Sequence, residues 1–484
     1  MGNARPQTRH SGGPAGEMRG TVTPNKLLTI AIALFAIALS PLPAAADKNA
    51  EGDCSCVPGQ VIVQLANSAD LNAVAAQYGL SSTPISQVAD PSIYLMNITS
   101  GQTPQQVVAA MTTPADPRIV FAEVNRKLSN AEREGLSWTQ GRSWAIGRSW
   151  AIGGSSKGFG KQYFPRRIRL NEAFAAAGTR GLRIDNEAPV VVAVMDTGID
   201  LSHPAFAGRL VPQSQMWDFV DNDNDPSEVG QLRQDPSYGH GTHVAGIIAL
   251  TVPDAKIMPI RILGPDGSGE LWRITAGLIW AANNGADVVN LSIGYPERVR
   301  LLKDLLDCVD VGTTPTGTTF PEIGTKRLAV AVASGNGGNS TMIYPAAEQA
   351  DGMLSVGAST RYDSLAPFSS YERSWVDVTA PGEDIVSALP GGRYGVWSGT
   401  SMAAPIVAGI TALVKARYPT TFPTPHDLLD RVKETAVDKR FNLQPFGEVR
   451  LKRVDALCAV TNNQNCPIPQ NAGLFSGIEA FSVR

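Results

Sequence analysis

The stretch from Ser398 to Pro405 constrains the fold of this chain more than any other. Ser401 is followed by a run of small and apolar residues, from Met402 to Leu413, with almost no polar position at helical spacing. A helix that is apolar on every side has to be buried on every side, so the chain must build a large core around it. Pro405 is tolerated only in or near a first helical turn. Ser401 is therefore expected at the start of this helix, among backbone N–H groups that lack partners within it.

A serine in this position has two interpretations. Most serines at helix starts are ordinary N-cap residues, whose oxygen accepts a backbone hydrogen bond. The aligned peptide dipoles of a helix also favour negative charge at its start, which suits a nucleophile. The second interpretation requires a base and an orienting acid elsewhere in the chain.

Two other segments supply such partners. The run from Val190 to Met195 is typical of a strand buried in a parallel sheet, and it ends in Asp196. Open α/β sheets place their sites at the carboxyl ends of strands. His240 precedes another small, apolar helix. A lone Asp-Thr-Gly also occurs in aspartic proteases, but those need a second Asp-Thr-Gly or Asp-Ser-Gly, which this chain lacks. Packing alone does not explain the order Asp, His, Ser.

These three segments resemble the subtilisin-like serine proteases, or subtilases, over residues 166–460. The resemblance rests on the residues around Asp196, on His240 to Gly246 and on Gly399 to Pro405. It implies that Ser401 is the nucleophile, that His240 is the general base and then acid, and that Asp196 orients the imidazole. The chemistry agrees, because a serine hydroxyl needs a base that titrates near neutral pH. His243 is then a structural neighbour.

The resemblance also implies an oxyanion donor and a substrate site. Asn336 follows an apolar run, and its amide could donate to the oxyanion that forms when Ser401 attacks a carbonyl. Asparagine before glycine usually marks only a turn. Two extended segments would hold a peptide by main-chain hydrogen bonds, which favours broad specificity. The substrate-binding residues expected on this basis are Gly267, Ser268, Gly269, Ser292, Ile293, Gly294, Ser334 and Gly335.

An acidic loop precedes His240. Carboxylates at alternating positions could hold a structural calcium ion, and many subtilases bind stabilising calcium. The loop lacks the glycine and the final glutamate of an EF-hand, so a solvated acidic loop is the alternative. The candidate ligands are Asp218, Asp221, Asp223 and Asp225. No cofactor is expected to be required for catalysis.

The region 166–460 alternates apolar strands with helices and predicts an α/β fold with a doubly wound parallel sheet. Strands are expected at 190–194, 257–262, 287–291, 328–333, 354–357 and 375–379. Helices are expected at 241–250, 271–284, 402–417 and 425–435, and residues 454–457 would complete the domain.

The first 46 residues are interpreted as a secretory signal. Basic residues precede an apolar run from Leu27 to Ala46, which ends in small residues and invites cleavage before Asp47. A retained membrane anchor is the alternative, although two prolines interrupt the run. Met18 is an alternative start. The protein is therefore expected to be secreted, to the periplasm or beyond the cell, without a stable membrane anchor.

Residues 47–128 are expected to form a separate unit. Between 57 and 128 the pattern is β-α-β-β-α-β, as in ferredoxin-like folds, and it resembles the subtilase propeptide, a folding aid and intramolecular inhibitor. A generic ferredoxin-like domain is the alternative. Residues 129–165, with the repeat from Gly141 to Ile152, are interpreted as a linker where maturation cleavage would fall. Residues 461–484 form a tail.

Composition excludes other classes of protein. The chain has 484 residues, 43% hydrophobic and 18% charged, which indicates a globular protein of more than one domain. A net charge of −3 gives no electrostatic case for binding nucleic acid. Export would bring the five cysteines into an oxidising compartment, where Cys458 and Cys466 are close enough in sequence to pair.

The sequence thus predicts a secreted, monomeric serine endopeptidase that acts on polypeptides through an acyl-enzyme and is made as a self-processing proenzyme. One alternative is a binding-only or inactive member of the fold, although all the catalytic positions are filled. A serine esterase is another alternative, but the Gly-x-Ser-x-Gly motif is absent at Ser401.

Overall fold

The computed structural model describes residues 56–88, 93–130, 156–232, 234–311, 327–443, 447–463 and 466. The predicted signal at 1–46, the alternative start, most of the 129–165 linker with its repeat and nearly all of the 461–484 tail lie outside these residues. Helices, strands and contacts are defined for the described residues.

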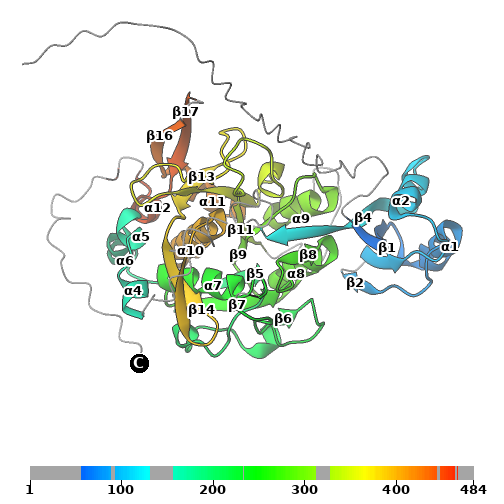
Figure 1. Ribbon diagram of the computed structural model, residues 1–484, viewed down its shortest axis with the longest axis horizontal. Coiled ribbons are helices and arrows are strands. Elements are labelled where there is room, and N and C mark those ends of the chain that lie inside the picture. Colours follow the sequence, from blue (N-terminus) through cyan, green and yellow to red (C-terminus); the bar gives the residue numbers. More distant parts are fainter. Residues whose placement is uncertain are drawn as a thin grey trace, which may run out of the picture. The chain divides into compact units, whose positions relative to one another are not determined.

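A largely parallel sheet forms the core of the region after residue 156 (Figure 1). Only its β16–β17 pair is antiparallel among the pairings along it. Chain order reverses at β5, which has later strands on both sides, so the sheet is doubly wound as predicted. In spatial order its strands are β16 (Val437–Leu443), β17 (Gly447–Arg453), β13 (Val378–Pro381), β12 (Met353–Ser359), β11 (Ala329–Ala333), β9 (Val288–Leu291), β5 (Val191–Asp196), β7 (Lys256–Arg261) and β6 (Trp217–Asp218).

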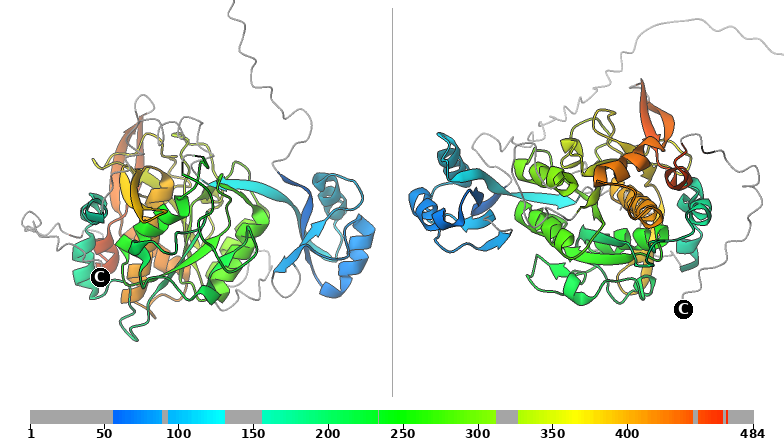
Figure 2. Two further views of the ribbon diagram at one scale, coloured as in Figure 1. Left: turned by 60° about the horizontal axis from the view of Figure 1, so that its bottom comes forward. Right: turned by 180° about the vertical axis from the view of Figure 1, so that it is seen from behind.

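Helices cover both faces of this sheet (Figures 1 and 2). On one face α7 (His240–Thr251) and α10 (Thr400–Arg417) pack against Val192 and Val194 of β5. On the other face α8 (Leu271–Asn283) and α9 (Arg300–Val311) pack against Ala193 and Met195 of the same strand. Alternate side chains of a strand point to opposite faces, and here both sets are apolar because both faces are covered.

The central helix α10 is buried on every side, as its sequence predicts. Every residue from Thr400 to Val414 is buried. At Gly409 an added Cβ would lie 2.6 Å from the Cβ of Thr251, the last residue of α7. The absence of a side chain at Gly409 therefore lets the two helices approach each other closely.

The N-terminal unit has the β-α-β-β-α-β order that its sequence predicts. Its strands pair antiparallel in the order β4-β1-β3-β2. The last strand is longer than expected: it continues past Asn125 to Asn130 and pairs with two further strands, β8 (Ser268–Glu270) and β10 (Ile293–Gly294). The elements of the unit are β1 (Cys56–Leu65), α1 (Leu71–Tyr78), β2 (Ser86–Val88), β3 (Ile93–Asn97), α2 (Pro104–Thr112) and β4 (Ile119–Asn130).

Several elements were not expected from the sequence. They include α9, the β16–β17 hairpin, and a second hairpin formed by β14 (Ile385–Leu389) and β15 (Arg393–Trp397). Three short helices open the region: α4 (Ser156–Gly160), α5 (Phe164–Arg167) and α6 (Leu170–Ala177). The region closes with α11 (Pro425–Glu434), which has a capping box at Thr424, and α12 (Ala456–Thr461).

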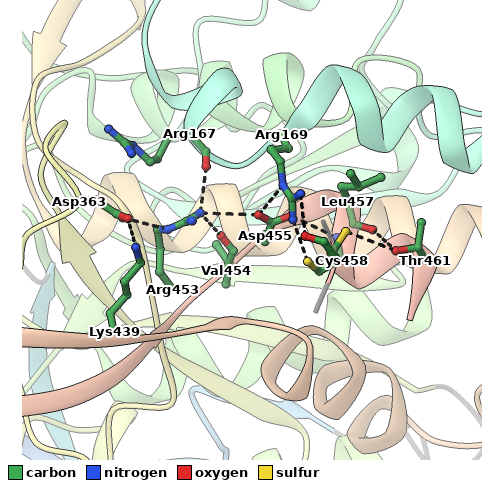
Figure 3. A network of polar contacts seen from close by, with 11 residues as sticks. Arg167, Arg169, Asp363, Lys439, Arg453, Val454, Asp455, Leu457, Cys458 and Thr461 are labelled. Atoms are coloured by element: carbon green, nitrogen blue, oxygen red, sulfur yellow. Dashed lines mark hydrogen bonds and ion pairs between the residues drawn. The ribbon is translucent and has the colours of Figure 1, made fainter. Parts of the chain in front are cut away.

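A network of ion pairs and hydrogen bonds links α6, β17 and α12 (Figure 3). Asp455, the N-cap of α12, accepts a hydrogen bond from Arg169 Nε at 2.8 Å. Arg169 also contacts Cys458 Sγ at 2.9 Å. Cys458 and Cys466 are free thiols, so the disulfide considered from their spacing is not formed. Burial raises the pKa of Cys458 to about 12, so its thiol is protonated at neutral pH.

The contact between α7 and α10 gives a prediction about stability. We expect Gly409→Ala to destabilise the fold by about 1–3 kcal/mol, because the new methyl group overlaps Thr251 and the helices must separate. Thermal unfolding followed by circular dichroism would show a lower Tm. An unchanged Tm would mean that α10 can shift without loss of packing.

Candidate active site

Asp196 and His240 are held together at the centre of the fold. Asp196 is the last residue of β5, at the point where strand order reverses, and His240 is the first residue of α7. His240 Nδ1 lies 2.7 Å from Asp196 Oδ1, and both side chains are almost fully buried. A buried carboxylate on Nδ1 fixes the ring and stabilises its protonated form.

Two glycines let the turn after Asp196 meet α7: one lies in the turn and the other in the first turn of the helix. Thr197 N donates to Asp196 Oδ1 at 2.8 Å, which holds the carboxylate toward the histidine. Gly198 has a φ of 106° and leaves no room for a Cβ beside the Ser227 carbonyl. A Cβ on Gly241 would lie 2.1 Å from the carbonyl oxygen of Gly198. The strand end and the helix start thus approach backbone to backbone.

Ser401 lies in the first turn of α10, but it is not the N-cap. That position belongs to Gly399, which has no side chain to cap the helix. Ser401 is fully buried, and its carbonyl oxygen lies 3.4 Å from Ser292 Oγ. Trp397, just before α10, lies 6.1 Å from His240 at the start of α7, and Gly409 of α10 packs against the last residue of α7, so the helices run in the same general direction. His240 and Ser401 therefore begin neighbouring helices at the same edge of the sheet.

Trp397 lies beside the histidines, four positions before Ser401. Its ring centroid is 6.1 Å from that of His240, and it stacks on His243 at 4.8 Å with an interplanar angle of 9°. Burial lowers the pKa of His243 to about 3, so this ring is neutral at physiological pH. His243 therefore packs as an uncharged ring behind His240. Nothing in the sequence singled out Trp397.

Asn336 is positioned by the residue before Ser401. Its Oδ1 accepts hydrogen bonds from Thr400 N at 2.9 Å and from Thr400 Oγ1 at 3.1 Å. Gly335 N donates to the same hydroxyl at 3.1 Å. Because the amide oxygen is engaged by Thr400, the amide nitrogen of Asn336 is the end that can act as a donor elsewhere. Ser334 and Gly335 therefore lie next to the start of α10.

The two segments expected to bind substrate lie on either side of β4. Lys127, Leu128 and Ser129 pair with Glu270, Gly269 and Ser268 of β8, in that order. On the other side, Ser129 and Asn130 pair with Gly294 and Ile293 of β10. Gly267 precedes β8 directly, and Ser292 precedes β10. An extended segment of the chain itself thus lies where the sequence predicts a bound peptide.

Side chains of β4 also cap two helices of the larger region. Asn125, fully buried, accepts from Trp272 N near the start of α8 at 3.1 Å. Glu123 accepts from Arg300 N and Leu301 N, at the start of α9, at 3.0 and 3.1 Å. Burial raises the pKa of Glu123. Helix N-termini favour such acceptors, so these contacts anchor the strand.

A further acid near Asp196 and His240 was not predicted as a site residue. Glu228 follows the acidic loop and accepts a hydrogen bond from Thr197 Oγ1 at 2.6 Å and another from Thr242 Oγ1 at 2.7 Å. The one available signal was the glycine before His240, because a helix without a side-chain cap needs acceptors from elsewhere.

The structure does not arrange the predicted calcium loop as a four-carboxylate cation site. Arg261 Nη1 lies 2.6 Å from Asp218 Oδ2 and 2.5 Å from Asp221 Oδ2. Asp223 accepts from the backbone of Asp225 instead. A guanidinium thus neutralises two of the expected ligands, which does not fit calcium held by all four. Within the described ranges, the three-ligand grouping with metal-binding proximity is Asp455, Cys458 and Cys466, where Arg169 already supplies positive charge.

Comparison with known proteins agrees with this geometry. A model of the subtilase family matches residues 187–457, more than half of the chain, and a model of the fervidolysin N-terminal prodomain matches residues 43–125. A thermophilic serine proteinase from Bacillus sp. (strain AK1) is 38% identical over 269 residues, which cover 53% of this chain and 58% of that protein. Thermitase from Thermoactinomyces vulgaris is 34% identical over 267 residues, with 53% and 83% covered.

Subtilisin E from Bacillus subtilis (strain 168) is 36% identical over 260 residues, which cover 51% of this chain and 60% of that protein. A solved structure of a cold adapted subtilisin-like serine proteinase is 29% identical, with a TM-score of 0.44 and 56% of this chain covered. The chain spans about three fifths of two of the three relatives named. The match over more than half of its length shows that the chain belongs to the subtilase family of serine peptidases.

Proposed function

We propose that this protein is a secreted serine endopeptidase whose nucleophile is Ser401, with His240 as base and Asp196 as orienting acid. The observation that carries the proposal is the buried 2.7 Å contact between His240 Nδ1 and Asp196 Oδ1, at the edge of the sheet where α10 begins with Thr400 and Ser401. An acid–base pair of this kind beside a serine is the arrangement that activates a hydroxyl.

In the proposed acylation step His240 acts twice, first as a base and then as an acid. Asp196 keeps a proton on His240 Nδ1, so that Nε2 accepts the proton of the Ser401 hydroxyl as its oxygen attacks the peptide carbonyl. The oxyanion receives hydrogen bonds from the Ser401 backbone N–H and the Asn336 amide. His240 then protonates the leaving amine, and water repeats the sequence on the acyl-enzyme.

A substrate would bind as β4 does in the structure, as the middle strand between β8 and β10. Main-chain pairing on both sides gives affinity without regard to sequence. Leu128, only 3% exposed, packs into the apolar core beside β8. We therefore expect broad specificity with a preference for a bulky apolar residue at the position that Leu128 occupies.

The N-terminal unit would act as an inhibitor that the enzyme removes from itself. Its strand β4 fills the peptide site, and Glu123 and Asn125 anchor it. β10 is antiparallel to β4, with Gly294 opposite Ser129 and Ile293 opposite Asn130, so the described end of β4 lies closest to Ser292, whose hydroxyl contacts the Ser401 carbonyl. The register thus favours cleavage within a few residues after Asn130, inside the 125–166 interval expected from the sequence.

Export rests on the sequence of residues 1–46, which the structure does not describe. Among the described helices, none combines the length and the apolar character needed to cross a membrane. We propose that the protein is a monomer in a compartment outside the cytoplasm. Its substrates would be polypeptides, and its own N-terminal unit would be its inhibitor.

Two other functions receive less support. A binding-only member of the family would not need the Asp196–His240 contact, because burying an ionisable carboxyl and an imidazole costs free energy. A serine esterase would need no peptide site, yet β8 and β10 hold an extended chain by backbone pairing.

Replacement of the nucleophile tests the proposal. We expect Ser401→Ala to remain folded, to lose about 10⁶-fold in peptidase activity and to accumulate as an uncut proform, since the triad acts as a unit. Peptide hydrolysis and intact mass spectrometry of both proteins measure this. The same mature N-terminus in both would assign maturation to another protease, and full activity in the variant would remove the mechanism.

The oxyanion donor is tested separately. We expect Asn336→Ala to lower kcat about 10²–10³-fold with little change in KM, because its amide would bind the transition state and not the ground state. Steady-state kinetics on a peptide substrate give both constants. Equal loss in binding would show that Asn336 only shapes the loop beside Thr400.

Calcium at the acidic loop stays a prediction from the sequence. If it binds there, excess calcium over chelator raises the Tm, and Asp221→Ala combined with Asp223→Ala abolishes the rise. If Arg261 instead supplies the only cation, the Tm of the wild type is the same in calcium and in EDTA. Differential scanning fluorimetry separates these results.

A further inference from the structure

Four donors converge on the carboxylate of Glu228. Its Oε1 accepts from Thr197 Oγ1 at 2.6 Å and from Gly239 N at 2.9 Å. Its Oε2 accepts from Thr242 Oγ1 at 2.7 Å and from Thr242 N at 3.2 Å. The residue is partly exposed, but both of its oxygens face these two segments of the chain.

The donors belong to the two segments that carry the acid and the base of the site. Thr197 directly follows Asp196, while Gly239 and Thr242 flank His240. Thr197 Oγ1 also accepts from Gly241 N at 3.0 Å, so its hydroxyl bridges the carboxylate and the helix. One acid therefore ties the end of β5 to the start of α7.

Helix α7 depends on these contacts because it has no cap of its own. Its N-cap is Gly239, with a φ of 92° and no side-chain oxygen. A capping side chain would normally accept hydrogen bonds from the N–H groups of Gly241 and Thr242. Here Gly241 N donates to Thr197 and Thr242 N donates to Glu228. A carboxylate at a helix N-terminus is also favoured by the helix dipole.

We propose that Glu228 is a positioning residue of the serine peptidase, which sets His240 against Asp196 by capping α7 from outside the helix. The inference rests on the proposed catalytic role of these two residues. His240 is the first residue of α7, so any shift of that helical turn changes the distance between Nδ1 and Oδ1 directly. Displacements of about 1 Å at reacting groups can lower turnover about 10²-fold.

The charge of Glu228 gives this role a distinctive pH dependence. An ionised carboxylate accepts all four hydrogen bonds, whereas a protonated one becomes a donor and has to give up one of them. Burial raises the pKa of Glu228 to about 7, against the opposing effect of its hydrogen bonds. The titratable groups that interact with it are Asp196 from β5 and Tyr238 just before α7, and its Oε2 lies against the first turn of α7, which carries His240.

The test compares Glu228→Gln with a control at the other end of the same strand. Asp287 likewise accepts from β5, at Val191 N at 2.9 Å, and pairs with Arg183, far along the strand from Asp196. We expect Glu228→Gln to lower kcat about 10–100-fold with KM nearly unchanged. In the pH profile of kcat/KM, the acid limb of Glu228→Gln should lie at lower pH than that of the wild type. It should follow the ionisation of His240 alone, whereas the wild type follows those of His240 and Glu228. Asp287→Asn should lower the Tm alone.

A second pair of variants tests the inference even if Glu228→Gln folds poorly. Thr197→Val removes the bridging hydroxyl and should lower kcat, and Thr197→Ser should restore it. Wild-type kcat and pH profile in Glu228→Gln or in Thr197→Val, with only a lower Tm, would overturn the inference and leave Glu228 a structural cap. Full activity in Ser401→Ala would instead refute the proposed function, so the two failures are distinguishable.

Discussion

The site depends on two buried helices that begin without a side-chain cap. The N-caps of α7 and α10 are Gly239 and Gly399, neither of which has a side-chain oxygen to accept from the first turn. Backbone donors at helix starts need acceptors, and burial makes their absence costly. At α7 the acceptors are Thr197 and Glu228, whereas at α10 the amide oxygen of Asn336 takes up Thr400 N. The side chains that accept hydrogen bonds from the first N–H groups of these helices are thus the ones that surround the site.

The same need for acceptors joins the N-terminal unit to the larger region. Helices α8 and α9 receive acceptors from Asn125 and Glu123, both on β4. The strand then continues between β8 and β10, so one element both anchors the N-terminal unit and occupies the predicted peptide site. This connection explains why β4 is longer than its apolar pattern indicated, since its last residues are ordered by partners far away in sequence.

Local sequence patterns predicted the main elements of the fold because helices and strands that are buried on all sides are apolar along their whole length. The strand before Asp196 and the helix after Ser401 are apolar throughout, and both were predicted within a few residues. The family assignment was also correct. The amphipathic helix α9 and the hairpin β14–β15 were missed, because their signals depend on what covers them.

Side-chain partners were less predictable. The acidic loop offered four carboxylates, but the sequence could not show that Arg261, forty residues away from Asp221, takes two of them. Likewise the residues next to Glu228 and Trp397 did not mark them, because their contacts cross the fold, and only the glycine before His240 indicated that α7 needs an acceptor from elsewhere. The catalytic and oxyanion roles of the predicted residues stay predictions until activity is measured.

The caps that β4 supplies to α8 and α9 have a consequence for the life of the protein. If maturation removes the N-terminal unit, both helix starts lose acceptors that were present while the chain folded. The mature form would then be less able to reach its own structure than the precursor was, and a molecule that unfolds would not return. Its persistence would then be governed by the height of the unfolding barrier and not by an equilibrium.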